Sequence, residues 1–263
     1  MTRLALVGGG RMGEALLAGL LADGWAEAGD VVVVEPVTSR RDELSGRYPG
    51  IGVSDQVVDA DGVVVAVKPG QVEAVCREVA TRSVGRVLSI AAGVTLTTLE
   101  AALAPATPVV RAMPNTPALV GSGAAAIAGG SHAAPADLEW AESILAAVGM
   151  VARVDEKLLD AVTGLSGSGP AYVFLVAEAL IEGGVLAGLP RDTATDLTVA
   201  TLLGSARLLA ETGDDAATLR AAVTSPGGTT AAGLQALEDR ATRAAFIAAV
   251  AAATGRSRQL AEG

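Results

Sequence analysis

The chain has 263 residues, a formal net charge of −10 and a single cysteine. This length suits one large or two modest domains with a real hydrophobic core. The negative charge argues against a nucleic-acid-binding protein, which needs a clustered basic face. Cys76 has no partner in the chain, which rules out an internal disulfide and fits a reducing compartment.

Two features of the apolar residues argue against export and membrane insertion. The run Leu4–Val7 is too short for the core of a signal peptide and leads directly into glycines. The apolar helices expected near the C-terminus are interrupted by Glu178, Glu182, Arg207 and Arg243, so we expect no run long enough to span a bilayer. We therefore expect a cytoplasmic protein without a membrane partner.

The first motif is a glycine loop between a predicted strand, Arg3–Val7, and a predicted helix, Glu14–Ala22. A Gly-x-Gly-x-x-Gly sequence in this setting strongly indicates dinucleotide binding. Its first glycine permits a turn, its second admits the pyrophosphate, and its third lets helix and strand pack closely. The free N–H groups at the start of the helix then face the phosphates. The positions that we expect to bind the dinucleotide here are Gly8, Gly10, Arg11, Met12 and Gly13.

The end of the second predicted strand, Val31–Val34, carries opposing signals about the coenzyme. Glu35 stands where an acidic residue binds the ribose 2′-hydroxyl of NAD(H). Ser39, Arg40 and Arg41 follow within one turn, and two guanidinium groups there could hold the 2′-phosphate of NADP(H). A solvated first turn of helix accounts for these arginines equally well, so the preference between the two coenzymes stays open.

Three further apolar runs are predicted to be strands: Gly62–Val67, Val87–Ile90 and Val109–Ala112. In an open α/β sheet, ligands lie outside the carboxyl ends of the strands. Lys68 follows the first of these strands, a position that favours contact with the coenzyme. Asn115 follows the third between two prolines, which fix the loop so that its amide can reach nicotinamide or substrate.

The two halves of the chain differ in pattern. Before residue 155, strands alternate with helices such as Pro135–Val148, and Ser122–Ala128 and Val151–Val154 complete the predicted strands. After it, the pattern is helical throughout. We therefore predict an α/β protein with a Rossmann-type doubly wound sheet over residues 1–154 and an all-α domain over residues 155–263. Ala171–Leu186 is apolar on nearly all faces, which indicates a helix at an oligomer interface.

Two segments of the helical half combine glycines with hydroxyl residues. Thr163–Tyr172 contains Pro170, where we expect a long apolar helix to begin. The glycines of this segment indicate that its backbone closely approaches a ligand. Thr224–Thr230 opens a helix with adjacent glycines and free N–H groups, which favours a small carboxylate or phosphate. Ordinary capping of that helix by Ser225 or Thr229 is the alternative.

The residue inventory limits the chemistry. One histidine, one cysteine and no carboxylates at ligand spacing predict no metal site. The hard step then falls to the cofactor, and the protein supplies position and electrostatics. No lysine follows Lys157, which points away from alcohol oxidation and towards an imine that is easily protonated. A threonine hydroxyl could assist that step by hydrogen bonding.

Taken together, six segments of the chain resemble pyrroline-5-carboxylate reductases, in the order of that family: Gly8–Gly13, Ala66–Pro69, Ala91–Val94, Met113–Pro117, Asp160–Tyr172 and Ser225–Thr230. The resemblance implies an oxidoreductase that transfers a hydride from NADP(H) or NAD(H) to the imine of 1-pyrroline-5-carboxylate. The product would be L-proline, in the last step of proline biosynthesis. The resemblance also implies a homodimer that interlocks through its C-terminal helices, and decamers built from such dimers.

The resemblance assigns roles to matching positions. Thr163 matches the hydroxyl near the imine nitrogen and is the catalytic candidate. Beyond the glycine loop, the positions that match dinucleotide contacts are Val67, Lys68, Pro69, Ala91 and Ala92. The substrate pocket matches Glu156, Ser225, Gly227, Gly228, Thr229 and Thr230, and the last five would hold the carboxylate.

This sequence departs from the family pattern at two places. Glu35 stands where NADPH-preferring members usually have a small hydroxyl residue. The segment Asp55–Asp61 looks shortened, which leaves Gln56 as the nearest match for a family asparagine that contacts the coenzyme.

Three alternatives to this function differ in what they need from the sequence. A reductase of another cyclic imino acid would differ in the size of the pocket. A β-hydroxyacid dehydrogenase would need the helical lysine that is missing. A catalytically silent NAD(P)H-sensing protein would keep the glycine loop and lose the motifs of the second half, which are present here.

Overall fold

The protein, described by a computed structural model over residues 2–261, consists of two compact units. The first unit runs to Ser168 and also takes in the chain from Ala251 on; the second is Gly169–Val250. The sequence predicts the boundary at residues 154 and 155, which is earlier. The difference arises because Leu159 is buried in a core of the sheet, and because Ser257 Oγ donates a 2.7 Å hydrogen bond to Asp160 Oδ1.

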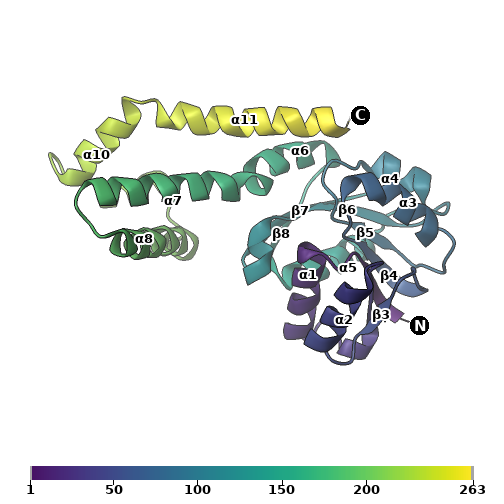
Figure 1. Cartoon of the computed structure of the whole chain (residues 1–263). Coiled ribbons are helices and arrows are strands. Elements are labelled where there is room, and N and C mark those ends of the chain that lie inside the picture. Colours follow the sequence, from purple (N-terminus) through teal and green to yellow (C-terminus); the bar gives the residue numbers. More distant parts are fainter. Residues whose placement is uncertain (1, 262–263) are drawn as a thin grey trace. The chain divides into compact units, whose positions relative to one another are not determined.

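Eight strands form a single sheet in the first unit, in the order β3-β2-β1-β4-β5-β6-β7-β8 (Figure 1). The strands from β3 to β6 are parallel, β7 is antiparallel to β6, and β8 is parallel to β7. This arrangement confirms the predicted Rossmann-type doubly wound sheet. The strand bounds are β1 Thr2–Val7, β2 Val31–Val34, β3 Gly52–Ser54, β4 Ala60–Val65, β5 Val87–Ser89, β6 Val109–Met113, β7 Gly123–Gly129 and β8 Gly149–Arg153.

Helices cover both faces of this sheet and bury a hydrophobic core on each. Side chains alternate along the strands, so that in β1 Leu4 and Leu6 enter one core while Ala5 and Val7 enter the other. The helices over the first core are α1 Arg11–Ala22, α2 Thr38–Arg47 and α5 Pro135–Ala146. The helices over the second core are α3 Pro69–Val79, α4 Leu96–Ala102 and α6 Leu159–Val162.

The segment rich in glycine and hydroxyl residues is helical. A π-helical turn, Thr163–Gly167, follows α6 directly and leads into α7, Gly169–Leu186. In this turn the N–H of Ser168 donates to the carbonyl of Thr163 at 2.8 Å, five residues back, where an α-helix would bond four residues back. The new helix that the sequence predicts at Pro170 is therefore a continuation of an existing one.

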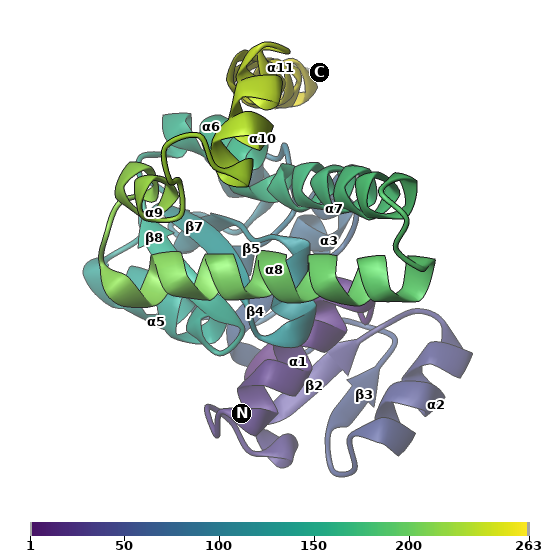
Figure 2. The same ribbon diagram turned by 90° about the vertical axis from the view of Figure 1, so that its left-hand side faces the viewer.

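The second unit is entirely helical, which confirms the predicted all-α character of this part of the chain. Its long helices α7 and α8 pack against each other. Figure 2 shows the two short helices α9 and α10 that connect α8 to α11 along the chain. The helix bounds are α8 Arg191–Thr212, α9 Ala216–Ala222, α10 Thr229–Glu238 and α11 Thr242–Ala261.

One apolar stretch corrects an expectation from the sequence. Because the π-helical turn keeps the helix unbroken, Glu156–Leu186 is a continuous stretch of 31 residues that is long and apolar enough to cross a membrane, by length and composition alone. The interruptions at Glu178 and Glu182 do not shorten it below that limit.

Candidate functional site

The carboxyl ends of β1, β2, β4 and β5 lie at one edge of the sheet, because these strands are parallel and adjacent. The loops that follow them carry most of the residues predicted to bind the coenzyme. The sheet therefore brings together the glycine loop, Glu35, Lys68 and the Ala91–Ala92 turn, which are scattered along the sequence.

The glycine loop leaves open space beside the N-terminus of α1. Gly8 has a φ of +111°, and a Cβ atom there would lie 2.6 Å from the carbonyl oxygen of Ala66. A Cβ atom at Gly13 would collide with the carbonyl oxygen of Gly8. At Gly10, by contrast, a Cβ atom would meet nothing within 4 Å. The open position at Gly10 is the N-cap of α1, where no side chain caps the first N–H groups of the helix.

Arg11 and Met12, two other residues predicted to bind the dinucleotide, differ in exposure. Arg11 is exposed at the first position of α1. Met12 packs against the core on the α1 face of the sheet.

Glu35 is buried, with 9% of its surface exposed, and its carboxylate holds the glycine loop. Its Oε2 atom accepts a hydrogen bond from the N–H of Gly9, and its Oε1 atom accepts one from the N–H of Val37, both at 3.0 Å. The carboxylate is thus fixed at the end of β2, where a ribose hydroxyl would bind.

Arg40 is already engaged inside the protein. Its Nε atom donates to the carbonyl of Gly9 at 2.7 Å, and its terminal nitrogens pair with Glu14 at 2.5 Å and Glu43 at 2.7 Å. Burial raises the pKa of the Glu14 carboxyl, but hydrogen bonds from Arg40 and Arg47 outweigh it and leave the pKa below its usual value. These contacts use three of the five N–H donors of the guanidinium, so Arg40 is held in place and keeps two donors for a 2′-phosphate.

The neighbours of Arg40 complete this first turn of α2. Arg41 donates to the carbonyls of Glu35 at 2.6 Å and Pro36 at 2.9 Å, so it also serves the backbone. Ser39 is exposed at the second position of the helix. Of the residues proposed for a 2′-phosphate, Ser39 is the one whose side chain lies open to solvent.

The turns after β4 and β5 present both polar and apolar groups to this edge. Lys68 is exposed and caps α3 without an ion pair in the described part of the chain, while Pro69 begins the helix. Val67 packs against a core and lies beside Gly8. Ala91 is buried and Ala92 is exposed, so the backbone of this turn and the small Ala92 side chain face the ligand space.

A cavity of about 540 Å³ opens next to these turns and contains Thr163 in its wall. This volume lies within the roughly 300–1,000 Å³ of small-molecule sites. The Thr163 hydroxyl donates to the carbonyl of Leu159 at 2.8 Å, which leaves its oxygen lone pairs as acceptors. The cavity is lined, entirely by residues of the first unit, by Pro69, Ala92, Gly93, Val94, Thr163, Ser168, Ala253, Arg256, Ser257 and Leu260.

Three predicted site residues have other structural partners. Asn115 Nδ2 donates to the carbonyl of Ser166 at 3.0 Å, and its Oδ1 accepts from the N–H of Ala124 at 2.8 Å. Glu156 does not line the cavity. Gln56 is exposed in a turn after β3, where its N–H donates to Ser54 Oγ at 3.1 Å.

The Glu156 carboxylate instead joins three elements of the first unit. Its Oε1 atom accepts from the N–H of Leu96, at the start of α4, and from the Arg111 guanidinium in β6, both at 2.7 Å. Arg111 is buried, with 6% of its surface exposed, so its charge needs this partner.

The second glycine motif lies in the second unit, at the start of α10. Gly227 has a φ of +69°, and the N–H of Gly228 donates to the carbonyl of Ser225 at 3.1 Å, which closes a tight turn. The residue at the N-cap is Gly228 itself, which has no side chain to satisfy the first N–H groups of α10. These groups are therefore available to a carboxylate.

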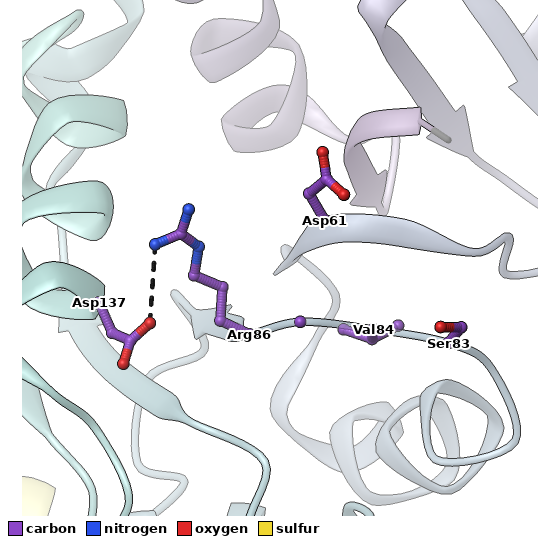
Figure 3. Close-up of a pocket in the computed structure, with 6 residues that line it drawn as sticks. Asp61, Ser83, Val84, Arg86 and Asp137 are labelled. Carbon is purple, nitrogen blue, oxygen red and sulfur yellow. Dashed lines mark ion pairs between the residues drawn. The ribbon is translucent and has the colours of Figure 1, made fainter.

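A second hollow, of about 340 Å³, lies at the opposite edge of the sheet, where β4 and β5 begin (Figure 3). Here the Arg86 guanidinium pairs with Asp137 of α5 at 3.6 Å and lies 4.8 Å from the centre of the Trp140 ring. This arginine is thus satisfied within the protein. Within residues 2–261, no three His, Cys, Asp or Glu side chains lie close enough to hold a metal ion.

Comparison with known proteins connects this geometry to one family. The family described as "Pyrroline-5-carboxylate reductase dimerisation" matches residues 156–260, and the one described as "NADP oxidoreductase coenzyme F420-dependent" matches residues 3–93. The pyrroline-5-carboxylate reductase of Mycobacterium tuberculosis is 45% identical, over 99% of this chain and 97% of the relative. The chain belongs to the pyrroline-5-carboxylate reductase family.

Solved structures of pyrroline-5-carboxylate reductases share the fold over nearly the whole chain. The enzyme from Coxiella burnetii superposes with a TM-score of 0.93 at 37% identity and covers 98% of both chains. The enzyme from Plasmodium falciparum, determined with NADP bound, has a TM-score of 0.83 at 27% identity, with 99% of this chain and 98% of that chain covered. The resemblance found in the six motifs is therefore confirmed.

Several residues of the cavity wall were not among those predicted from the sequence. Ser168 lies within the recognised glycine and hydroxyl segment, so its type and place were a usable signal. Arg256 and Ser257 lie in α11, far along the chain, and no local pattern marks them. Their position follows from the return of α11 to the first unit, which is a tertiary feature.

Proposed function

We propose that this chain reduces the imine of 1-pyrroline-5-carboxylate with NAD(P)H and forms L-proline, the last step of proline biosynthesis. The observation that carries the proposal is the 45% identity over 99% of the chain to a pyrroline-5-carboxylate reductase. The cavity supports the proposal, because Thr163 lines it together with Pro69 and Ala92. These two residues lie at the coenzyme edge, the edge of the sheet where the loops after β1, β2, β4 and β5 meet. A bound reduced nicotinamide would supply the hydride, and the protein would bind, orient and exclude water.

The coenzyme edge fits a dinucleotide phosphate. The open space at Gly10 and the N-terminus of α1 would receive the pyrophosphate. Lys68 and Arg11 are the exposed cations beside it. NADP(H) use is supported by the family match over residues 3–93 and by the Plasmodium falciparum relative with NADP bound. NAD(H) fits the same edge, because Glu35 is fixed where it can accept the 2′-hydroxyl.

Thr163 would orient the imine. Since its own proton is donated to Leu159, its oxygen would accept a hydrogen bond from the N–H of the protonated imine. This contact fixes the carbon–nitrogen double bond so that one face meets the incoming hydride. The protonated imine then needs no acidic side chain, which agrees with the lack of a lysine after Lys157.

The carboxylate of the substrate would bind at the start of α10. Ser225 and Thr230 would supply hydroxyls, and the amides of Gly227 and Thr229 would supply N–H groups beside a helix N-terminus. This device needs no basic side chain.

A second copy of the chain would cover the apolar helices of the second unit. None of the side chains of α7 is buried within one chain, and the family match over residues 156–260 is to a dimerisation domain. We therefore propose a homodimer that forms through these helices, and decamers built from such dimers. We also propose that the enzyme is cytoplasmic and has no membrane partner. Large apolar side chains that the dimer would bury are Phe174, Leu175, Leu186, Leu197, Val199, Leu203 and Ile247.

The activity itself is tested by following oxidation of NADPH and NADH with 1-pyrroline-5-carboxylate. We expect turnover with the imine and none without substrate. In the reverse direction, with NADP+ or NAD+, we expect no oxidation of β-hydroxy acids. A related cyclic imino acid with a larger ring serves as the specificity control. No turnover with 1-pyrroline-5-carboxylate would remove the main proposal, and faster turnover with the larger ring would change the substrate.

Substitution of Thr163 tests its place in the chemistry. Thr163→Ala removes one hydrogen bond worth about 1–1.5 kcal/mol, so kcat should fall about tenfold while coenzyme binding is retained. Thr163→Ser keeps the hydroxyl and should retain most of the rate. Steady-state kinetics and coenzyme titration measure both effects. Equal rates for the alanine variant and the parent would exclude this role.

Substitution of Glu35 tests the coenzyme preference. Glu35→Ser removes a fixed negative charge that repels a 2′-phosphate, so the ratio of kcat/KM for NADPH to that for NADH should rise about tenfold. Glu35→Gln is the matched control, because it removes the charge and keeps the size of the side chain. If the ratio changes in neither variant, Glu35 does not face the ribose.

The assembly is tested by sedimentation velocity on the whole chain. We expect a dimer or a multiple of it, and Phe174→Glu on α7 should shift the population towards monomer because it buries a charge in an apolar interface. The control is Val120→Glu on the first unit, where the side chain is 78% exposed. A monomeric parent protein would contradict the proposal.

A further inference from the structure

The helical path through the first glycine and hydroxyl segment contains a backbone carbonyl that loses its usual donor. In an α-helix, the N–H of residue 170 would donate to the carbonyl of residue 166. Residue 170 is proline, which has no N–H. Ser166 lies in the π-helical turn Thr163–Gly167, and the donor that a regular α-helix would give its carbonyl is missing.

Asn115 supplies that donor from a neighbouring loop. Its Nδ2 atom lies 3.0 Å from the carbonyl oxygen of Ser166. Its Oδ1 atom accepts from the N–H of Ala124 at 2.8 Å, which fixes the plane of the amide. The side chain is buried, with 9% of its surface exposed, and its loop is held between Pro114 and Pro117.

The π-helical turn also packs closely against the residues just before the Asn115 loop. Gly167 faces Met113, the last residue of β6, and a Cβ atom at Gly167 would lie 2.6 Å from Met113 Cε. The turn can therefore rest directly against the end of β6, two residues before Asn115. The contact and the hydrogen bond act on the same short segment.

The held turn carries two residues of the cavity wall. Thr163 and Ser168 both line the cavity, and the N–H of Ser168 donates to the carbonyl of Thr163 at 2.8 Å across the turn. A change at the Ser166 carbonyl would disturb this bond, because both lie in one helical turn. The orientation of the Thr163 hydroxyl depends on the backbone of that turn.

We propose that Asn115 is a positioning residue for the reduction: it replaces the donor that Pro170 lacks and so holds the π-helical turn that carries Thr163. This inference rests on the proposed function for its kinetic readout only. It gives Asn115 a task other than the coenzyme contact expected from the sequence.

The kinetic test uses Asn115→Ala and a rescue. Asn115→Ala should lower kcat about tenfold and leave KM for NADPH within about twofold, because misplacing a reacting group costs rate more than binding. Pro170→Ala restores an N–H that can donate to Ser166, so the double variant should regain most of the lost kcat. Pro170→Ala alone is the control and should change kcat less than about twofold.

Combination with Thr163→Ala separates positioning from general damage. If Asn115 acts through Thr163, the variant with both changes should be no slower than the slower single variant. Multiplied losses would overturn the proposal, and so would a raised KM for NADPH at unchanged kcat. If Asn115→Ala does not fold, the double variant with Pro170→Ala should fold, and its failure to do so would also overturn the proposal.

Hydrogen–deuterium exchange tests the held turn without using activity. Amide exchange in peptides covering residues 160–172 should become at least about tenfold faster in Asn115→Ala and return towards the parent value with Pro170→Ala. Unchanged exchange in Asn115→Ala would overturn the proposal even if the enzyme is active. An inactive parent with the expected exchange pattern would refute the proposed function and leave this inference standing.

Discussion

One missing backbone donor shapes the candidate site of this protein. Pro170 has no N–H to donate in the helical path that continues from α6 into α7, and the π-helical turn Thr163–Gly167 lies just before it. The widened turn accepts a side-chain donor from Asn115 and leaves Thr163 and Ser168 in the cavity wall. A regular α-helix would leave the Ser166 carbonyl without a donor, because residue 170 is proline. Irregular backbone thus occurs where a ligand site needs it.

The parallel sheet supplies the other half of the site. Because β1, β2, β4 and β5 run in one direction, their loops meet at one edge, and the glycine contacts hold those loops close together. Gly8 approaches the carbonyl of Ala66, and Gly13 approaches the carbonyl of Gly8, at distances that no side chain permits. The cavity next to this edge begins at Pro69 and Ala92, so coenzyme loops and the π-helical turn share one wall.

Local patterns predicted most of the fold because they reflect local physics. The strands β1, β2, β4, β5 and β6 are buried apolar runs, and the long helices have apolar surfaces. The strand and helices that were missed are short: β3 has three residues, and α4 and α9 have seven each, too few for a period to be visible. The π-helical turn was missed because glycines and hydroxyls ordinarily indicate a loop, and the structure overrides that tendency with tertiary contacts from Asn115 and Met113.

The candidate site was less predictable, because the type of a residue does not fix its partner. Arg40 and Arg41 could serve a phosphate equally well by composition, yet they neutralise Glu14 and cap the backbone after β2. Glu156 pairs with a buried arginine for a similar reason, since Arg111 must have a counter-charge. Such choices depend on distances between elements far apart in the sequence.

The distribution of charge explains how an acidic protein can bind an anionic coenzyme and an anionic substrate. With a net charge of −10, the overall field repels both ligands, and screening limits its reach to about 8–10 Å in physiological salt. Inside that distance local groups decide. Arg40 and Arg47 neutralise Glu14, and the N–H groups of Gly9 and Val37 satisfy Glu35. Arg40 therefore favours a bound phosphate indirectly as well, because it cancels the charge of Glu14 that would otherwise oppose the anion.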